Sequence, residues 1–179
     1  MSQQSAALDC AIGEEVNLSP YHSDWPHAFA NERARLKSLF SAELLQIEHF
    51  GSTAIRDMPA KPIIDILAGV ASMTVADSLF EPILESGYTT SREFNAMLPD
   101  RRWFMRSSAG KRTHHLHVVV LDSTTWRERL AFRDKVRSNP ALAKRYAELK
   151  FELASRFKKD REAYTNAKAA FVAYVLALA

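Results

Sequence analysis

The residues best suited to chemistry lie between positions 49 and 67, where a corner of small residues is followed by a strand with a single acid. Gly51-Ser52-Thr53 follows an apolar run, and its glycine lets the backbone take unusual angles and a ligand approach the main chain. The hydroxyls and N–H groups of such a corner favour anion binding. Asp65 interrupts an otherwise apolar strand, where a carboxylate has to pair, bind a metal or face a cleft. Together they indicate phosphoryl or nucleotidyl chemistry.

A second group of candidates is the run His114-His115-Leu116-His117, which lies in a stretch with the alternation of a strand. Alternation places His115 and His117 on one face of the sheet and His114 on the other. Two imidazoles about 7 Å apart on one face could share a metal or position a phosphate. Two hydrogen-bonded histidines on an ordinary sheet face fit the sequence equally well.

Basic residues that could neutralise phosphate occur in two regions. The expected hairpin at residues 101–121 carries five arginines and lysines, and alternation places Arg102 and Arg106 on one face as a candidate phosphate clamp. Near the C-terminus, Lys150 and Lys168 each follow a tyrosine by four residues, so a phenol and an ammonium share one helix face. For most of these charges, solvation or pairing with a nearby acid is the simpler interpretation.

The elements that position these residues are expected within one domain at residues 14–179, preceded by a flexible leader at residues 1–13. Their order is helix, strand, strand, helix, hairpin, then further helices, with 92–99 as an irregular loop. The expected elements are a helix from about residue 24, strands at 43–50 and 62–70, a helix at 74–85, the hairpin, and helices from 123, 140 and 160. This order predicts an α/β fold, specifically an α+β mixed sheet with a C-terminal helical layer.

Composition argues against a nucleic-acid-binding, a disulfide-bonded and a membrane-spanning protein. A net charge of +3 and the lack of an aromatic-basic repeat argue against nucleic acid as a partner. The single cysteine, Cys10, excludes an internal disulfide. The sequence has neither a signal-peptide pattern nor an apolar run long enough for a membrane span, so we expect a cytoplasmic protein without a membrane partner. The oligomeric state is open at this point.

Several of these motifs, in the same order, resemble those of the GrpB family. His49-Phe50-Gly51-Ser52-Thr53 resembles the family's EHxGST corner, residues 60–67 its AKPIIDIL strand and residues 113–118 its THHLHV strand. The family's tail pattern FRD…Y..LK…YT..K is similar to Phe132-Arg133-Asp134, Tyr146, Leu149-Lys150, Tyr164-Thr165 and Lys168. The resemblance covers about residues 15–175. It implies a nucleotidyltransferase-like sheet, and similar domains occur fused to dephospho-CoA kinase.

The chain departs from the pattern of active nucleotidyltransferases at the second acid. Those enzymes follow the Gly-Ser corner with a strand that carries two carboxylates, often with a third acid later, and these hold two Mg²⁺ ions. Here Leu67 stands where the second acid is expected, and His115 and His117 where the third is expected. One carboxylate with imidazoles suits Mg²⁺ poorly because that ion prefers oxygen ligands. A transition metal, a single metal and no metal all stay open.

Two functions follow from the residues and the resemblance. The first is a nucleotidyltransferase for an unidentified small-molecule acceptor, in which Asp65, His115 and His117 are catalytic and hold a divalent metal (Mg²⁺, Mn²⁺ or Zn²⁺). Its predicted substrate-binding residues are Gly51, Ser52, Thr53, Lys61, Arg102, Lys150 and Lys168. The second is a non-catalytic module that binds a nucleotide, a CoA-like ligand or another phosphorylated small molecule. A partner-docking helical tail is a weaker third possibility, supported by the apolar residues 171–179.

Overall fold

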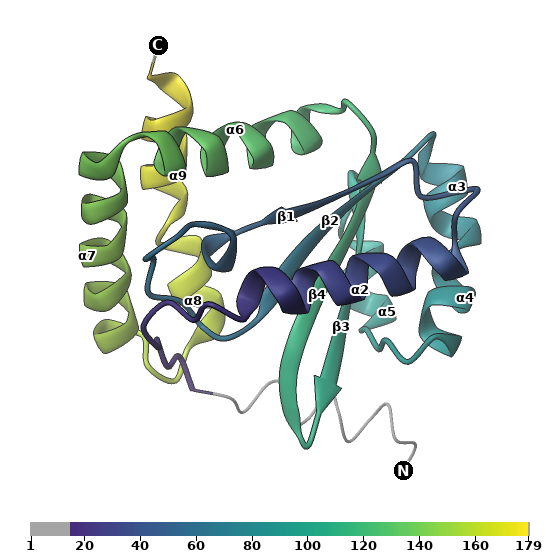
Figure 1. Cartoon of the computed structure of the whole chain (residues 1–179), viewed down its shortest axis with the longest axis horizontal. Coiled ribbons are helices and arrows are strands. Elements are labelled where there is room, and N and C mark those ends of the chain that lie inside the picture. Colours follow the sequence, from purple (N-terminus) through teal and green to yellow (C-terminus); the bar gives the residue numbers. More distant parts are fainter. Residues whose placement is uncertain (1–14, 179) are drawn as a thin grey trace.

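The computed structural model describes residues 15–178, which form a mixed four-stranded sheet with helices packed on it (Figure 1). Its strands, in the spatial order β1-β2-β4-β3, are β1 (Gln46–Phe50), β2 (Ile64–Val70), β4 (Lys111–Val120) and β3 (Arg101–Ser108). β1 with β2 and β3 with β4 are antiparallel, whereas β2 and β4 are parallel. The predicted leader lies outside the described residues.

The helices divide into those around the strands in sequence and those that follow the last strand. The first group comprises α2 (Trp25–Leu39), the short 3-10 helix η1 (Ser52–Ala54), α3 (Met73–Ser78), α4 (Phe80–Glu85) and α5 (Arg92–Ala96). The second group comprises α6 (Thr124–Ser138), α7 (Pro140–Arg156), α8 (Arg161–Asn166) and α9 (Ala169–Ala177). The predicted mixed α/β sheet with a C-terminal helical layer is confirmed. No helix in the described part of the chain is long and apolar enough to cross a membrane.

One face of the sheet is covered by α2, α3 and α4 (Figure 1). Ile66 of β2, Leu116 of β4 and Phe104 of β3 are fully buried there. They belong to one apolar cluster with Leu36 of α2 and Ile83 of α4. Burial of this kind, at about 25 cal/mol per Å² of apolar surface, is the main stabilising contribution of the sheet.

The opposite face of the sheet, which we call the Asp65 face, carries the candidate catalytic residues. Strand register aligns one row across the sheet, formed by Phe50, Asp65, His115 and Met105. The next row on this face is Glu48, Leu67, His117 and Trp103. The prediction that His115 and His117 share a face is therefore confirmed.

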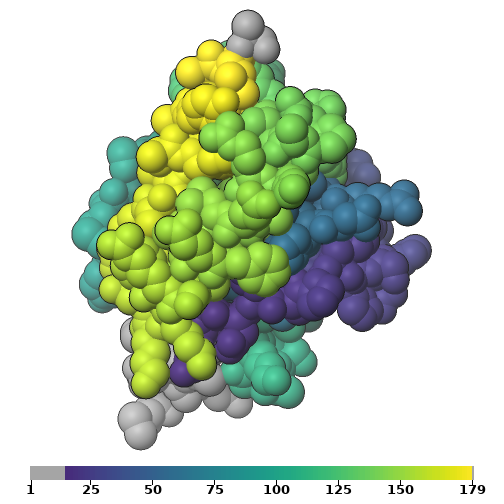
Figure 2. Space-filling view, turned by 90° about the vertical axis from the view of Figure 1, so that its left-hand side faces the viewer, coloured from purple at the N-terminus to yellow at the C-terminus, as the bar shows by residue number. Residues whose placement is uncertain are grey.

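The C-terminal helices pack beside and over part of the Asp65 face. Trp126 of α6 packs on Phe50 and Leu67, which closes one part of this face with an apolar cluster. Figure 2 shows α6 to α9, coloured green to yellow, packed together as one layer beside the purple N-terminal segment. Lys150 of α7 and Lys168 at the α8–α9 junction are close enough to Asp65 to interact with its charge.

Three segments differ from the expectation. The stretch expected as an irregular loop contains α5, a single turn whose N-cap Ser91 accepts from the Phe94 N–H. The helix expected at 74–85 is split into α3 and α4, and the one expected from residue 160 into α8 and α9. At the second break the Lys168 N–H bonds to the Thr165 carbonyl, a 3-10 type contact. Elements this short do not show a full hydrophobic period in the sequence.

Candidate active site

Asp65 and Gly51 form the centre of the site. Gly51 has φ +70° and ψ −170°, a backbone region that is essentially restricted to glycine. A Cβ at Gly51 would lie 2.3 Å from Oδ2 of Asp65, so the glycine leaves the space that the carboxylate occupies. Gly51 was predicted to let a ligand approach the main chain. In the structure, the space beside Gly51 is occupied by the carboxylate of Asp65.

The carboxylate of Asp65 pairs with His115 on the neighbouring parallel strand. Their side chains are joined by a hydrogen bond of 3.1 Å between Nδ1 of His115 and Oδ1 of Asp65. An ionised carboxylate only accepts, so Nδ1 of His115 carries the proton and Nε2 holds the lone pair. Nε2 is buried and has no hydrogen-bond partner in the described part of the chain. The pair therefore presents an unoccupied base.

Burial and charge act against each other on this pair. Burial raises the pKa of Asp65, but the hydrogen bond and charge of His115 and the charges of Lys61 and Lys168 outweigh it and lower the pKa below its usual value. Burial lowers the pKa of His115, and Asp65 only partly offsets this. At neutral pH the pair consists of an ionised acid and a neutral imidazole. The carboxylate side chain is still 27% exposed, so solvent or a ligand reaches it.

The corner Gly51-Ser52-Thr53 is held in place by hydrogen bonds of the buried Thr53 side chain. Thr53 is buried, and its hydroxyl donates to the Ile63 carbonyl (3.2 Å) while lying 3.0 Å from Nε2 of His49. The hydroxyl of Thr53 is thus committed to joining the corner to the start of β2, which is not the ligand-facing position that we predicted. Burial lowers the pKa of His49 to about 4, so its imidazole is neutral. Ser52 is half-buried and hydrogen bonds to Tyr146 of α7.

Three lysines from separate elements surround the acid. Lys61 lies in the loop before β2, Lys150 on α7 and Lys168 between α8 and α9. Lys61 and Lys168 both place Nζ against the ring of Tyr164, at 5.2 and 4.3 Å from its centroid. Lys150 donates to the Pro59 carbonyl. Nζ of Lys150 also lies 5.1 Å from the centroid of the Tyr146 ring, so the predicted phenol–ammonium pairs on the C-terminal helices are both formed.

Burial and neighbouring charges lower the pKa values of all three lysines. Burial, followed by the charges of Arg161 and Lys168, lowers the pKa of Lys61 to about 7. Burial and the charge of Lys168 likewise lower the pKa of Lys150 to about 7. Burial lowers the pKa of Lys168 to about 8, although Asp65 acts in the opposite direction. One carboxylate therefore does not balance the cations around it, and an anionic ligand would.

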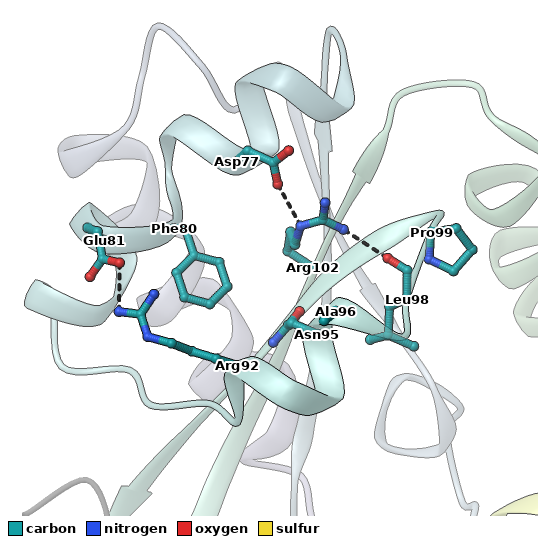
Figure 3. A pocket seen from close by; sticks show the side chains of 9 residues that line it. All are labelled: Asp77, Phe80, Glu81, Arg92, Asn95, Ala96, Leu98, Pro99 and Arg102. Carbon is teal, nitrogen blue, oxygen red and sulfur yellow. Dashed lines mark hydrogen bonds and ion pairs between the residues drawn. The ribbon is translucent and has the colours of Figure 1, made fainter.

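Arg102 does not join these residues. It alternates with Trp103 along β3, so its side chain lies on the face opposite Asp65. Its guanidinium donates to Asp77 (2.6 Å) and to the Leu98 carbonyl (2.9 Å), as Figure 3 shows. There it lines a cavity of about 490 Å³ bounded by α3, α4 and α5. The prediction grouped Arg102 with the site by residue type, and cross-strand pairing separates them.

The predicted metal ligands do not form a coordination shell. Among residues 15–178, no group of three or more His, Cys, Asp or Glu side chains is placed to hold an ion. Asp65 uses one oxygen for His115, and His117 lies one row further along the sheet with its ring perpendicular to that of Phe50. Leu67, at the position of the expected second acid, is fully buried under α6. The donors present do not fit a pair of Mg²⁺ ions, which need several oxygen ligands.

Sequence reasoning missed the arginines that border the histidines. Arg129 of α6 lies over the Phe50 ring, with its Cζ 5.3 Å from the centroid. Arg101 pairs across the sheet with Val119, on the Asp65 face. The signal for Arg129 was its spacing of three residues from Trp126, which places both on the buried side of one helix. Arg101 could be placed only with the register of the hairpin.

Comparison with known proteins agrees with this architecture. A family model described as "GrpB protein" matches residues 15–177. The chain is 35% identical over 170 residues to the glutamate-rich protein GrpB of Alkalihalophilus pseudofirmus, which covers 90% of this chain and 94% of the relative. The crystal structure of the conserved protein GrpB from Enterococcus faecalis superposes with a TM-score of 0.78 at 34% identity, covering 89% of this chain and 94% of that one.

Similar segments also occur in longer proteins. The chain is 36% identical over 154 residues to the UPF0157 protein YqkA of Bacillus subtilis, covering 86% of this chain but 44% of YqkA. A dephospho-CoA kinase of Mycolicibacterium paratuberculosis is 29% identical over 175 residues, covering 86% of this chain and 43% of the kinase. The predicted occurrence of such a domain within a dephospho-CoA kinase is thus confirmed. The matched range, the identities and the shared architecture together show that this chain belongs to the GrpB family.

Proposed function

We propose that this protein binds a nucleotide or another phosphorylated small molecule on its Asp65 face and transfers the nucleotidyl group to a small-molecule hydroxyl. The observation that carries the proposal is the convergence of Lys61, Lys150 and Lys168 around a single ionised carboxylate. Its second support is Nε2 of His115, a base without a partner among the described residues. The resemblance of the corner and strand to nucleotidyltransferase motifs supports the choice of reaction class.

Charge explains why phosphate is the ligand that fits. Burial opposes the protonation of all three lysines, and at each of them a neighbouring cation opposes it further. A di- or triphosphate placed among the three ammonium groups would replace repulsion with attraction, and its oxygens would accept the lysine donors. Lysine binds phosphate as a compact point charge, which suits the flexible chain of a nucleotide. An apolar or cationic ligand would gain nothing from this arrangement.

The proposed chemistry uses the Asp65–His115 pair as a base. Nε2 of His115 takes the proton from the acceptor hydroxyl, and Asp65 holds Nδ1–H and stabilises the resulting imidazolium. The acceptor oxygen forms a bond to the α-phosphorus while the bond from that phosphorus to the leaving pyrophosphate oxygen breaks. Lys61, Lys150 and Lys168 neutralise the charge that accumulates on the leaving group. No step is assigned to a metal, because the donor set does not fit one.

The first test is binding of ATP in the presence of EDTA, measured as a shift in the thermal unfolding midpoint. Ligand at 100 times its Kd stabilises the folded state by about 2.7 kcal/mol. Lys150→Met should weaken ATP binding by about 10-fold or more, since a charge-assisted contact contributes about 1.5 to 3 kcal/mol. Lys144→Met is the matched control, because Lys144 lies on the same helix but is exposed. Equal shifts for both variants would contradict the proposal.

Turnover is tested separately from binding. Pyrophosphate release is measured from each of ATP, CTP, GTP and UTP with pools of small hydroxyl compounds as acceptors. His115→Gln should keep ATP binding and lose release, because glutamine cannot take the proton. Retention of release in this variant would show that His115 is not the base.

The second candidate function is a ligand-binding module without catalysis, and the burial of Leu67 favours it. The position of a second acid is filled by an apolar side chain beneath Trp126. A protein that only senses a phosphorylated or CoA-like ligand needs the lysines but not the base. Ligand-induced stabilisation of wild-type protein, with no product from any acceptor pool, would select this function over transfer.

A further inference from the structure

A second cationic group lies on the Asp65 face, beyond the lysines. His117 is two residues after His115 on β4, and Trp103 is its partner on β3. Arg101 is one row further along the same face, and Arg129 approaches from α6. Lys61, in contrast, precedes the first residue of β2. Along the strand direction the reacting pair therefore lies between a lysine group and an arginine group.

Each side chain of this second group has one buried nitrogen that lacks a hydrogen-bond partner in the described part of the chain. Nδ1 of His117, Nε of Arg101 and Nε of Arg129 have no hydrogen bond within residues 15–178. Unpaired buried polar groups are costly and uncommon in folded proteins. Three of them on neighbouring side chains indicate a position that oxygens of a ligand would complete.

The surrounding charges leave this position cationic. Burial, and then the charge of Arg101, lowers the pKa of Arg129 to about 10, so the Arg129 guanidinium is charged at neutral pH. Asp100 is the acid with the largest effect on Arg129, and its carboxylate already accepts from Thr125 (2.6 Å) and from Nη1 of Arg101 (3.0 Å). Burial, with the charge of Arg129, holds the pKa of His117 well below its usual value, so this imidazole is neutral.

We infer that the acceptor is itself anionic, and that Arg101, Arg129 and His117 bind its carboxylate or phosphate group. This inference rests on the proposed transfer function and names the class of its second substrate. Binding there places the acceptor beside the unpartnered Nε2 of His115, which then reaches the acceptor hydroxyl. The donor phosphates occupy the lysine group, so the two substrates approach the reacting pair from opposite ends of the face.

The test uses inorganic phosphate as the probe and NMR of the full chain with labelled histidines as the readout. Phosphate should shift the His117 ring resonances in a saturable manner. Arg129→Gln and Arg101→Gln should each weaken this binding by at least about 10-fold. Arg127→Gln, on the same helix but exposed, should leave it unchanged. Absence of a saturable shift at His117, or equal binding in Arg129→Gln and Arg127→Gln, would overturn the inference.

Two further variants distinguish loss of phosphate binding from misfolding, and the arginine group from the lysine group. Arg129→Lys retains the charge but lacks the guanidinium fork, and it should show intermediate affinity if Arg129→Gln fails to fold. Lys150→Met should not change the His117 response to phosphate. If Lys150→Met abolished that response while Arg129→Gln preserved it, phosphate would occupy the lysine group, which would overturn the second site and keep the proposed donor site. A normal His117 response without any ATP binding would overturn the donor site alone.

Discussion

Gly51 and Asp65 lie in direct contact, and the substitution Gly51→Ala perturbs that contact. The new Cβ would lie 2.3 Å from Oδ2 of Asp65, so the carboxylate would have to move by about 1 Å to reach ordinary contact distance. Alanine also has to adopt φ +70° and ψ −170°, which is strained by about 1 to 3 kcal/mol. Loss of the hydrogen bond to His115 adds about 1.5 to 3 kcal/mol.

The expected total loss in free energy of unfolding is therefore about 2.5 to 6 kcal/mol, measured by urea denaturation. Gly110→Ala is the matched control, because Gly110 has φ +72° but a Cβ there would meet nothing within 4 Å. Gly110→Ala should therefore lose free energy of unfolding only through backbone strain, because it does not displace Asp65.

A second readout separates the displaced carboxylate from general destabilisation. Asp65 raises the pKa of His115, so moving it away should lower that pKa further, as followed by NMR titration. Gly110→Ala should leave the pKa of His115 where it is. If the two variants lost equal stability and the pKa of His115 were the same in both, the contact between Gly51 and Asp65 would not hold the Asp65–His115 pair in place.

Other substitutions and conditions have expected outcomes of their own. Thr53→Val should lower the free energy of unfolding by about 1 to 3 kcal/mol, because it removes the hydroxyl that bonds the Ile63 carbonyl inside the protein; urea denaturation beside the exposed Thr124→Val measures this. Leu67→Asp should cost more than Leu67→Ala, itself worth about 2 to 5 kcal/mol, since a carboxylate beneath α6 would have no partner; equal losses would mean that a second acid is tolerated. The free energy of unfolding should rise with pH from about 7 to 10. In the folded state Lys61 and Lys150, with pKa values of about 7, lose their protons in this range, whereas in the unfolded state the same lysines keep them. Thermal unfolding across this range checks the sign, and Lys150→Met should flatten the slope.

Much of this arrangement was predictable because it depends on short-range patterns. The period-2 alternation of residues 114–120 placed His115 and His117 on one face, and the four-residue spacing of Tyr164 and Lys168 placed ring and ammonium together. The unusual backbone angles expected at Gly51 are present, and the group beside it is the carboxylate of Asp65. In each case the signal is local: a short residue repeat, or a glycine where the backbone needs unusual angles.

What could not be predicted depends on contacts between distant segments. Arg102 was assigned to the site by its type, yet the register of β3 directs it to Asp77 on the opposite face. Arg129 joins the site only because α6 packs over Phe50. The convergence of Lys61, Lys150 and Lys168 arises where a loop, a helix and a helix junction meet. Short elements such as α5 were missed because one helical turn carries no period.

The most direct test of the lysine-based anion site is the pH dependence of ATP affinity in EDTA, measured by calorimetry above the last phosphate pKa of ATP. Lys61 and Lys150, with pKa values of about 7, have to be protonated to hold phosphate, so binding should take up protons. Affinity should fall by as much as about 10-fold per pH unit for each proton taken up. The exposed-site control Lys144→Met should follow the same curve, whereas Lys150→Met should show weaker and flatter binding. Affinity that is independent of pH and of Lys150, and that appears only when Mg²⁺ is added, would contradict the account.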